Sequence, residues 1–358
     1  AEALEAARRS GDERALAYAL NARHVSFWRA DRLDERLSIA REMVALAEGT
    51  WDRDGELQGR NWLVTDLFEA GEMAELDVAI DRYAQLSAEL RLPGFGWYAT
   101  LWRAALAALR GELGEAEPLL REAVQTGTSG GDPNVELADQ VRLGIHWMRG
   151  DFEAAYAHYV PMAEPKLATS PASLSFRCGW AFLAAGSGRE AEAREQLRRL
   201  VSHGLDRIPF DVNWLETIGT LGETCAMLGE PESARQLYGL LLPYAGRLEP
   251  VAGRALVSWG TADRHLGVMA TAISRFGDAE RHFEAALREN DRLGFRPWLA
   301  WTRYQYTQML HARDAPGDRV RAGEELLAAA ELAGEFGLDG LGQRIAGLRG
   351  SAPEPAKR

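Results

Sequence analysis

The chain has 358 residues, of which 46% are hydrophobic and 26% are charged, and its formal net charge is −12. This acidity argues against a nucleic-acid-binding face, because phosphate contacts need a basic patch. No apolar run approaches the roughly 18 residues of a membrane-spanning helix, and no signal peptide is recognisable. We therefore expect a cytoplasmic protein that contacts neither nucleic acid nor membrane directly.

The dominant pattern is a helical hairpin that recurs along the chain. Each copy has a Gly or an equivalent residue at the turn between its two helices, which we call the anchor. The anchors are Ala30, Gly71, Gly111, Gly150, Gly186, Gly229, Ser274 and Gly317. Successive anchors lie 36 to 45 residues apart, which predicts a repeat architecture.

Small and large residues recur at fixed distances from the anchors. Six of the eight positions five residues after an anchor are Ala: Ala116, Ala155, Ala191, Ala234, Ala279 and Ala322. A large residue often follows at nine positions, as in Tyr159 and Phe283, and Gly precedes three anchors by seven positions, as in Gly222 and Gly267. A lone Gly inside a helix costs about 1 kcal/mol, so these glycines predict close contacts between helices.

A single hairpin cannot bury both of its faces, so neighbouring hairpins must stack. We predict an all-α, right-handed superhelical solenoid of about seven or eight antiparallel helical hairpins over residues 1–349. Residues 126–133 and 161–171 are rich in Gly or Pro and are predicted to be connections, and an insertion at 311–317 precedes the last hairpin. Residues 350–358 are predicted to form a disordered tail.

The hairpin pattern resembles the tetratricopeptide repeat. That family combines a Gly within the first helix, a Gly-Asp turn, an Ala and then an aromatic residue. Gly267, Gly277, Asp278, Ala279 and Phe283 match these positions. The chain departs from the family in length, because its repeats average about 41 residues where the family has about 34. Longer helices are the simplest explanation.

Long-helix arrays of this kind resemble the C-terminal module of large bacterial signalling ATPases, which include ATP-dependent LuxR-type transcription regulators and ATPase-linked class III adenylate cyclases. Residues 241–247, 277–283 and 297–304 carry the resemblance. It implies a sensor or scaffold module that receives an inducer or a partner and biases an ATPase between resting and active states. It does not say which effector domain accompanies the module.

Sequence motifs for chemistry are absent. The chain lacks a P-loop, a His-Glu-x-x-His zinc motif and a Gly-x-Ser-x-Gly nucleophile elbow. The Gly-rich stretches 94–96 and 127–130 do not follow a predicted strand and are interpreted as loops. Cys178 and Cys225 fall in apolar helical patterns and form no disulfide framework. We expect no catalytic residue, no cofactor and no metal in this chain.

The candidate binding surface is the concave side of the superhelix, which the first helix of each hairpin lines. Its candidate residues are Asn61, Tyr98, Trp147, Arg177, Trp180, Glu216, Asp263, Arg264, His265, Arg303 and Tyr304. Such a groove could hold a protein or peptide, or a small-molecule inducer, because aromatic and Arg side chains dominate binding at such sites. The alternative is that the Trp residues are core spacers between long helices.

The most polar stretch of a predicted first helix is Asp263-Arg264-His265. Adjacent residues do not face each other on a helix, so Asp263 and Arg264 are expected to pair with neighbouring units, with Arg303 and Tyr304 as the natural partners. Two interpretations stay open at this point. The stretch forms a salt bridge between repeats, or it contacts a ligand.

Three functions are compatible with the sequence. The first is a non-catalytic sensor or scaffold module of a bacterial signalling ATPase. The second is a free-standing adaptor that binds a protein or peptide, and the third and least favoured is an enzyme built on a helical-repeat scaffold. Oligomerisation is possible in each case.

Overall fold

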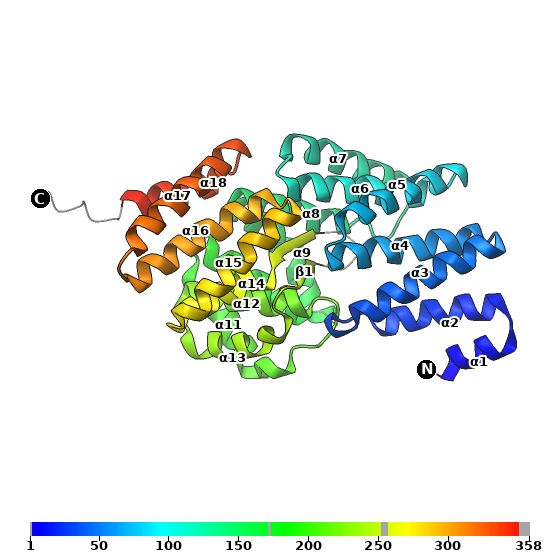
Figure 1. Ribbon diagram of the computed structural model, residues 1–358, viewed down its shortest axis with the longest axis horizontal. Coiled ribbons are helices and arrows are strands. Elements are labelled where there is room, and N and C mark those ends of the chain that lie inside the picture. The colour runs from blue at the N-terminus through cyan, green and yellow to red at the C-terminus, as the bar shows by residue number, and fades with distance from the viewer. Residues whose placement is uncertain (1, 171–172, 252–256, 351–358) are drawn as a thin grey trace, which may run out of the picture.

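The computed structural model describes residues 2–170, 173–251 and 257–350, and within them the chain forms an α-helical solenoid of eight hairpins. The first helices are α2 (Glu13–Ser26), α4 (Arg53–Ala70), α6 (Pro93–Arg110), α8 (Leu137–Arg149), α10 (Ser173–Gly186), α12 (Trp214–Leu228), α14 (Ala262–Ala272) and α16 (Arg296–Arg313). The second helices are α3 (Leu33–Thr50), α5 (Met73–Glu89), α7 (Leu113–Ser129), α9 (Phe152–Thr169), α11 (Glu190–His203), α13 (Pro231–Leu241), α15 (Phe276–Leu293) and α17 (Asp318–Glu335). Single helices α1 (Glu2–Ser10) and α18 (Asp339–Gly350) flank the array (Figure 1). The predicted fold class is confirmed.

Most anchors lie where the sequence placed them. Gly71, Gly111, Gly150 and Gly229 end the first helices of their hairpins with φ values of +73°, +90°, +80° and +66°. Side chains disfavour this left-handed conformation, which is why Gly recurs at the turn. Ser274 adopts the same conformation with φ +59°.

One anchor is displaced by two residues. Gly186 is the last residue of α10, and the residue with positive φ is Gly188. Accordingly the buried small residue of this hairpin is Ala193, whereas the predicted Ala191 is exposed. The register prediction for this hairpin was therefore wrong by half a helical turn.

The glycines inside first helices mark close helix contacts, as predicted. A Cβ atom on Gly222 would lie 2.2 Å from the Met269 sulfur, and one on Gly267 would lie 2.8 Å from the Phe283 ring. Phe283 is fully buried, so Gly267 provides the space into which this ring packs.

Two predicted connections are helical in part. Helix α9 continues through Pro161 and Pro165 to Thr169, and α7 continues to Ser129. Of the rest of the expected 161–171 connection, Ser170 is extended and residue 171 lies outside the described residues. A Pro inside a helix removes one backbone hydrogen bond, yet the packing of buried residues such as Ala163 outweighs that local cost. Likewise α18 extends to Gly350, and residues 351–358 of the expected tail lie outside the described residues.

A short β-hairpin is the main feature that the sequence analysis missed. Strands β1 (Leu248–Val251) and β2 (Val257–Thr261) pair antiparallel, and every residue in them is buried. The hairpin contacts the first helices α4, α6, α8, α12 and α14, and also α15. It therefore fills the concave side of the superhelix, near the middle of the molecule in Figure 1.

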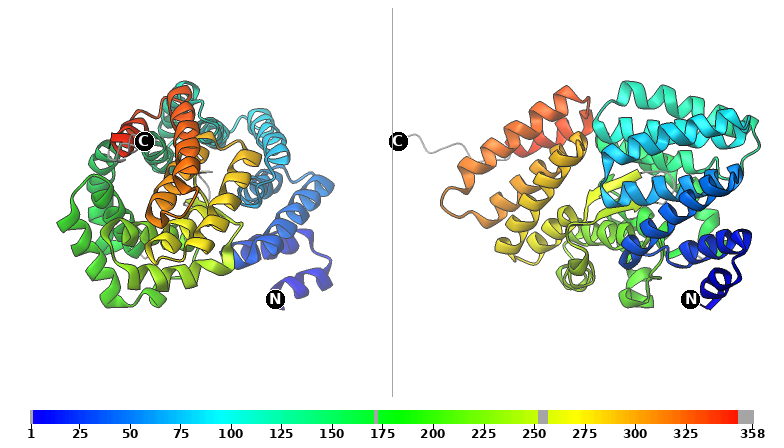
Figure 2. Two further views of the ribbon diagram at one scale, coloured as in Figure 1. Left: turned by 60° about the vertical axis from the view of Figure 1, so that its left-hand side comes forward. Right: turned by 45° about the vertical axis from the view of Figure 1, so that its right-hand side comes forward.

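The C-terminal hairpins close the superhelix against earlier turns. Arg292 donates to the Gly71 carbonyl at 3.4 Å, Trp301 to the Met148 carbonyl at 3.0 Å and Arg344 to the Gly186 carbonyl at 2.8 Å. All three acceptors lie at the C-terminal ends of first helices, where backbone carbonyls lack a partner within the helix. Figure 2 shows the orange C-terminal helices lying close to the green and cyan ones.

Across the described ranges, no helix is both long enough and apolar enough to cross a membrane.

Candidate functional site

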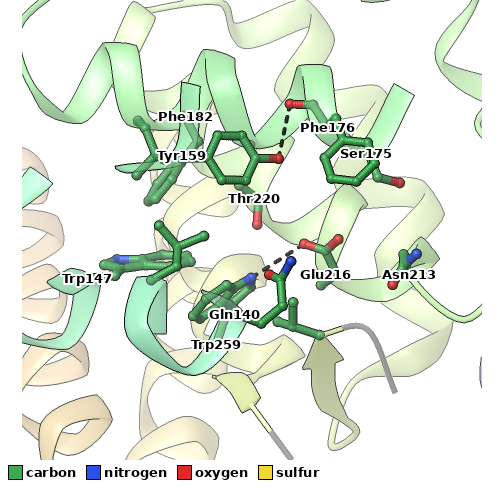
Figure 3. A pocket seen from close by; sticks show the side chains of 14 residues that line it. Gln140, Trp147, Tyr159, Ser175, Phe176, Phe182, Asn213, Glu216, Thr220 and Trp259 are labelled. Atoms are coloured by element: carbon green, nitrogen blue, oxygen red, sulfur yellow. Dashed lines mark hydrogen bonds between the residues drawn. The ribbon is translucent and has the colours of Figure 1, made fainter. Parts of the chain in front are cut away.

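A cavity of about 100 Å³ lies between the hairpin and helices α8, α9, α10 and α12. The side chains that define it most clearly are Trp147, Tyr159, Phe182, Glu216, Thr220 and Trp259 (Figure 3). Trp147 and Glu216 belong to the predicted candidates, and both project from first helices as expected. The cavity is a part of the concave side that the hairpin leaves unfilled.

Aromatic rings form the floor of the cavity. Trp147 is 2% exposed, and its ring centroid lies 4.3 Å from that of Phe182 and 4.4 Å from that of Trp259. Trp298 meets the same ring edge-on at 5.3 Å. Aromatic clusters of this kind are rigid, because each ring fixes the orientation of the next. Trp147 thus serves in the core and at the same time lines the cavity.

The carboxyl group of Glu216 forms the polar edge. It accepts a hydrogen bond from Trp259 Nε1 at 3.4 Å and one from Thr217 Oγ1 at 3.2 Å. Burial raises the pKa of Glu216 to about 8, and the nearby carboxylates of Glu249 and Asp211 also act to raise it. The two hydrogen bonds act to lower this pKa, but burial outweighs them. The group is therefore mostly protonated at neutral pH.

Two hydroxyl groups complete the lining. Tyr159 donates to the Phe176 carbonyl at 3.1 Å, and its phenol oxygen lies beside Gly179, where a Cβ atom would come within 2.4 Å of it. The Thr220 hydroxyl is buried and has no hydrogen-bond partner among the described residues. In Figure 3 this hydroxyl lies between Tyr159 and Trp259.

A buried ionic cluster lies behind the cavity. Arg264 donates to Glu223 at 2.9 Å, to Gln305 at 3.1 Å and to the Trp259 carbonyl at 3.1 Å. His265 bridges Glu249 on β1, at 2.5 Å, and Glu223 on α12, at 3.1 Å. These contacts fasten the β-hairpin to the solenoid.

The charges of this cluster stabilise one another. Burial and Arg264 both act to lower the pKa of His265, but the carboxylates of Glu249 and Glu223 outweigh them and raise it. Burial also acts to raise the pKa of Glu223, but Arg264 and His265 outweigh it and lower that pKa to about 2. Arg264 and His265 are fully buried, so the prediction that they face an open groove was wrong.

The interpretation of residues 263–265 as a contact between repeats holds for Arg264 and His265, which reach Glu223 in the preceding hairpin. Asp263 instead pairs within its own hairpin, contrary to the prediction. Asp263 lies 2.7 Å from His282 Nδ1 and accepts from the Gly246 backbone at 2.6 Å. Arg303 instead pairs with Glu325 at 2.6 Å, within its own hairpin. The sequence could not show that Arg303 points toward α17.

The remaining candidates lie away from the cavity. Arg177 donates to Gln196 at 2.6 Å and Trp180 to Glu192 at 2.5 Å, so both face α11. The others are buried in the helix packing of their own regions, and these are Asn61, Tyr98 and Tyr304. Sequence reasoning missed Tyr159 and Thr220 as lining residues. For Tyr159, the signal was the pairing of a large residue with Gly179.

No group of three or more His, Cys, Asp or Glu side chains suited to a metal ion occurs in the described part of the chain.

Comparisons with known proteins add little. No protein-family model matches the chain, and no curated protein matches it either. Among solved structures, it is similar to one entitled "Circular tandem repeat protein with novel repeat topology and enhanced subunit contact surfaces", at 15% identity and a TM-score of 0.18, over 97% of this chain and 92% of that one. A TM-score this low carries no weight for fold or function, which rest on the helices and contacts above.

Proposed function

We propose that the chain is a non-catalytic binding module that takes a small molecule, or one end of a larger one, into the cavity beside the β-hairpin. The observation that carries this proposal is a cavity of about 100 Å³ that combines aromatic walls with a carboxyl group and a free hydroxyl. Binding sites are typically apolar concavities with a few convergent polar groups. An apolar protein cavity of about 150 Å³ holds benzene, so the size suits a small group.

The position of the cavity supports a sensor role. Trp259 and Val251 of the hairpin line it, and the hairpin contacts helices from α4 to α15. A ligand that binds one arrangement of Trp259 better than another shifts the population of hairpin positions, and that shift reaches several repeats at once. By its resemblance to the C-terminal modules of signalling ATPases, we infer that the chain is the sensor arm of such a protein.

Fragment binding measured by ligand-observed NMR tests the cavity directly. Gln140→Trp at the partly exposed rim should block binding. Gln85→Trp on the exposed side of α5 is the matched control, and it should bind the same fragments as the unmodified chain. Failure of every fragment to bind, or equal binding by both variants, would overturn the proposal.

A partner-protein adaptor is the second candidate, and the N-terminal arm favours it. A depression of about 550 Å³ lies between α2, α3 and α4. Trp51, beside it, is 82% exposed and adopts φ +60°. An exposed Trp is a typical anchor at protein interfaces. If this role is correct, Trp51→Ser abolishes partner binding and Gln140→Trp does not.

A further inference from the structure

The charges around the cavity are unbalanced. Glu216 is the one acidic group that lines it, and no Arg, Lys or His occurs among the described lining residues. Arg264 lies 5.5 Å from the Trp147 ring centroid, but it does not line the cavity and it donates to Glu223 and Gln305. The described residues provide no ion-pair partner for Glu216.

Other buried carboxyl groups in the described structure have such a partner. Asp66 lies 2.8 Å from Arg36, Asp263 lies 2.7 Å from His282, and Glu249 lies 2.5 Å from His265. Burying a carboxylate without a counter-charge is unfavourable, which explains why the fold pairs these groups. Glu216 is less enclosed than these groups, and like the partly exposed Glu192 and Asp211 it has no ion-pair partner among the described residues. Of these three carboxyl groups, Glu216 is the one that lines the cavity.

Aromatic side chains surround the same space. Trp147, Tyr159, Phe176, Phe182 and Trp259 all line the cavity. Aromatic rings attract cations, and ammonium ligands are commonly held by several rings together with a carboxylate. The lining thus offers an ammonium group both a charge partner and an apolar surround.

We propose that the cavity binds the ammonium end of an organic cation, with the carboxylate of Glu216 as its counter-charge and the five aromatic side chains around its alkyl groups. This inference rests on the proposed function and names the ligand class of that site. The cavity holds only the charged end of a ligand, and the rest extends past the partly exposed Gln140.

Binding of a cation requires the carboxyl group of Glu216 to lose its proton. The pKa of Glu216 is about 8 in the free protein, so at neutral pH the bound cation displaces the carboxyl proton to solvent. The titratable groups that face Glu216 are Tyr159 on α9, Cys178 on α10, Glu249 on β1 and Asp211 before α12. Burial raises the pKa of Tyr159 and of Cys178 well above their usual values, so neither titrates near neutral pH.

Isothermal titration calorimetry of the full chain with a matched pair of probes tests the inference. Choline carries the ammonium group, and 3,3-dimethyl-1-butanol is its neutral isostere. At pH 8.5 choline should bind about tenfold more tightly than the alcohol, a preference that shrinks toward pH 6.5 with measurable proton release at pH 7. Glu216→Gln should remove the preference and the proton release but keep binding of the alcohol. Glu195→Gln, on the exposed side of α11, should behave like the unmodified chain.

The other possible results distinguish failure of the cation inference from failure of the proposed function. If the alcohol binds as tightly as choline, or if Glu216→Gln leaves the preference intact, the cation inference is wrong and the cavity remains a binding site for neutral ligands. If neither probe binds but fragments still bind in a manner that Gln140→Trp blocks, the cation inference alone fails. If nothing binds, both proposals fail.

Discussion

Two buried clusters in this molecule have the same composition, each with one Arg, one His and two carboxyl groups. They differ in the structural elements that they join. The first consists of His24, Arg36, Asp66 and Glu69, and the second of Glu223, Glu249, Arg264 and His265. In the first, Arg36 on α3 and His24 on α2 both reach α4, so the cluster joins consecutive helices. In the second, His265 on α14 joins α12 to strand β1.

The difference shows how charge is used inside a repeat array. The first cluster fixes the orientation of neighbouring units, which is a local task. The second holds an inserted segment against the inner surface of the array, and Glu216 lies beside it with no counter-charge from the residues that the structure describes. We infer that these two buried ionic clusters are structural, and that recognition takes place at the cavity edge that Glu216 forms.

The largest effects should come from removing the Arg of each cluster. Arg36→Met and Arg264→Met each leave buried carboxylates without their main counter-charge, so each should destabilise the chain by about 3–5 kcal/mol in urea unfolding. Only Arg264→Met should also weaken ligand binding, because Arg264 holds the Trp259 carbonyl. An equal loss of binding in Arg36→Met would show that the clusters do not differ in role.

A smaller effect should distinguish turns that contact the C-terminal helices from turns that do not. Gly150 and Gly229 both have positive φ, but a Cβ atom on Gly150 would lie 2.5 Å from the Leu341 backbone nitrogen, whereas nothing lies within 4 Å of one on Gly229. Gly229→Ala should therefore cost about 1–2 kcal/mol from backbone strain alone. Gly150→Ala should cost a further 1–3 kcal/mol, roughly, from overpacking. Equal melting temperatures for the two variants would argue against the closure contact.

The smallest effect concerns the pH dependence of stability. The pKa of Glu216 is raised to about 8 on folding, so its contribution is full below about pH 4.5 and is lost as the pH rises through 8. Glu223, with a pKa near 2, behaves oppositely, and its contribution is lost as the pH falls from about 4.5 toward 2. Glu216→Gln should gain about 2–4 °C in melting temperature over the unmodified chain between pH 5 and pH 9. A constant difference would mean that Glu216 is ionised in the free protein.

Local patterns in the sequence were sufficient for the helical array. The anchor Gly residues, the Ala at the crossing and glycines such as Gly267 each report a contact between helices that are adjacent in sequence. The same patterns located Trp147 and Glu216 on inner helix faces. These features are encoded by short-range periodicity, which a single sequence reveals.

Contacts between distant segments were not predictable in this way. Leu248–Val251 and Val257–Thr261 are short and buried on both faces, so they show no alternation that distinguishes a strand from a helix. Gly246, Pro250 and Gly260 were the available signal against a continuous helix there. The burial of Arg264 and the cavity itself depend on the β-hairpin. Because the sequence analysis did not predict the hairpin, it could predict neither of them.

The contact between the C-terminal helices and the first repeats has a further consequence. An open array can gain or lose a unit without harm and can unravel from one end, because each unit depends only on its neighbours. Here Arg292 in the seventh hairpin reaches Gly71 in the second across 221 positions of the chain, so this contact fixes the number of repeats between them. Unfolding should accordingly be a single cooperative transition, and deletion of one hairpin from the middle should be as harmful as removal of the whole C-terminal quarter.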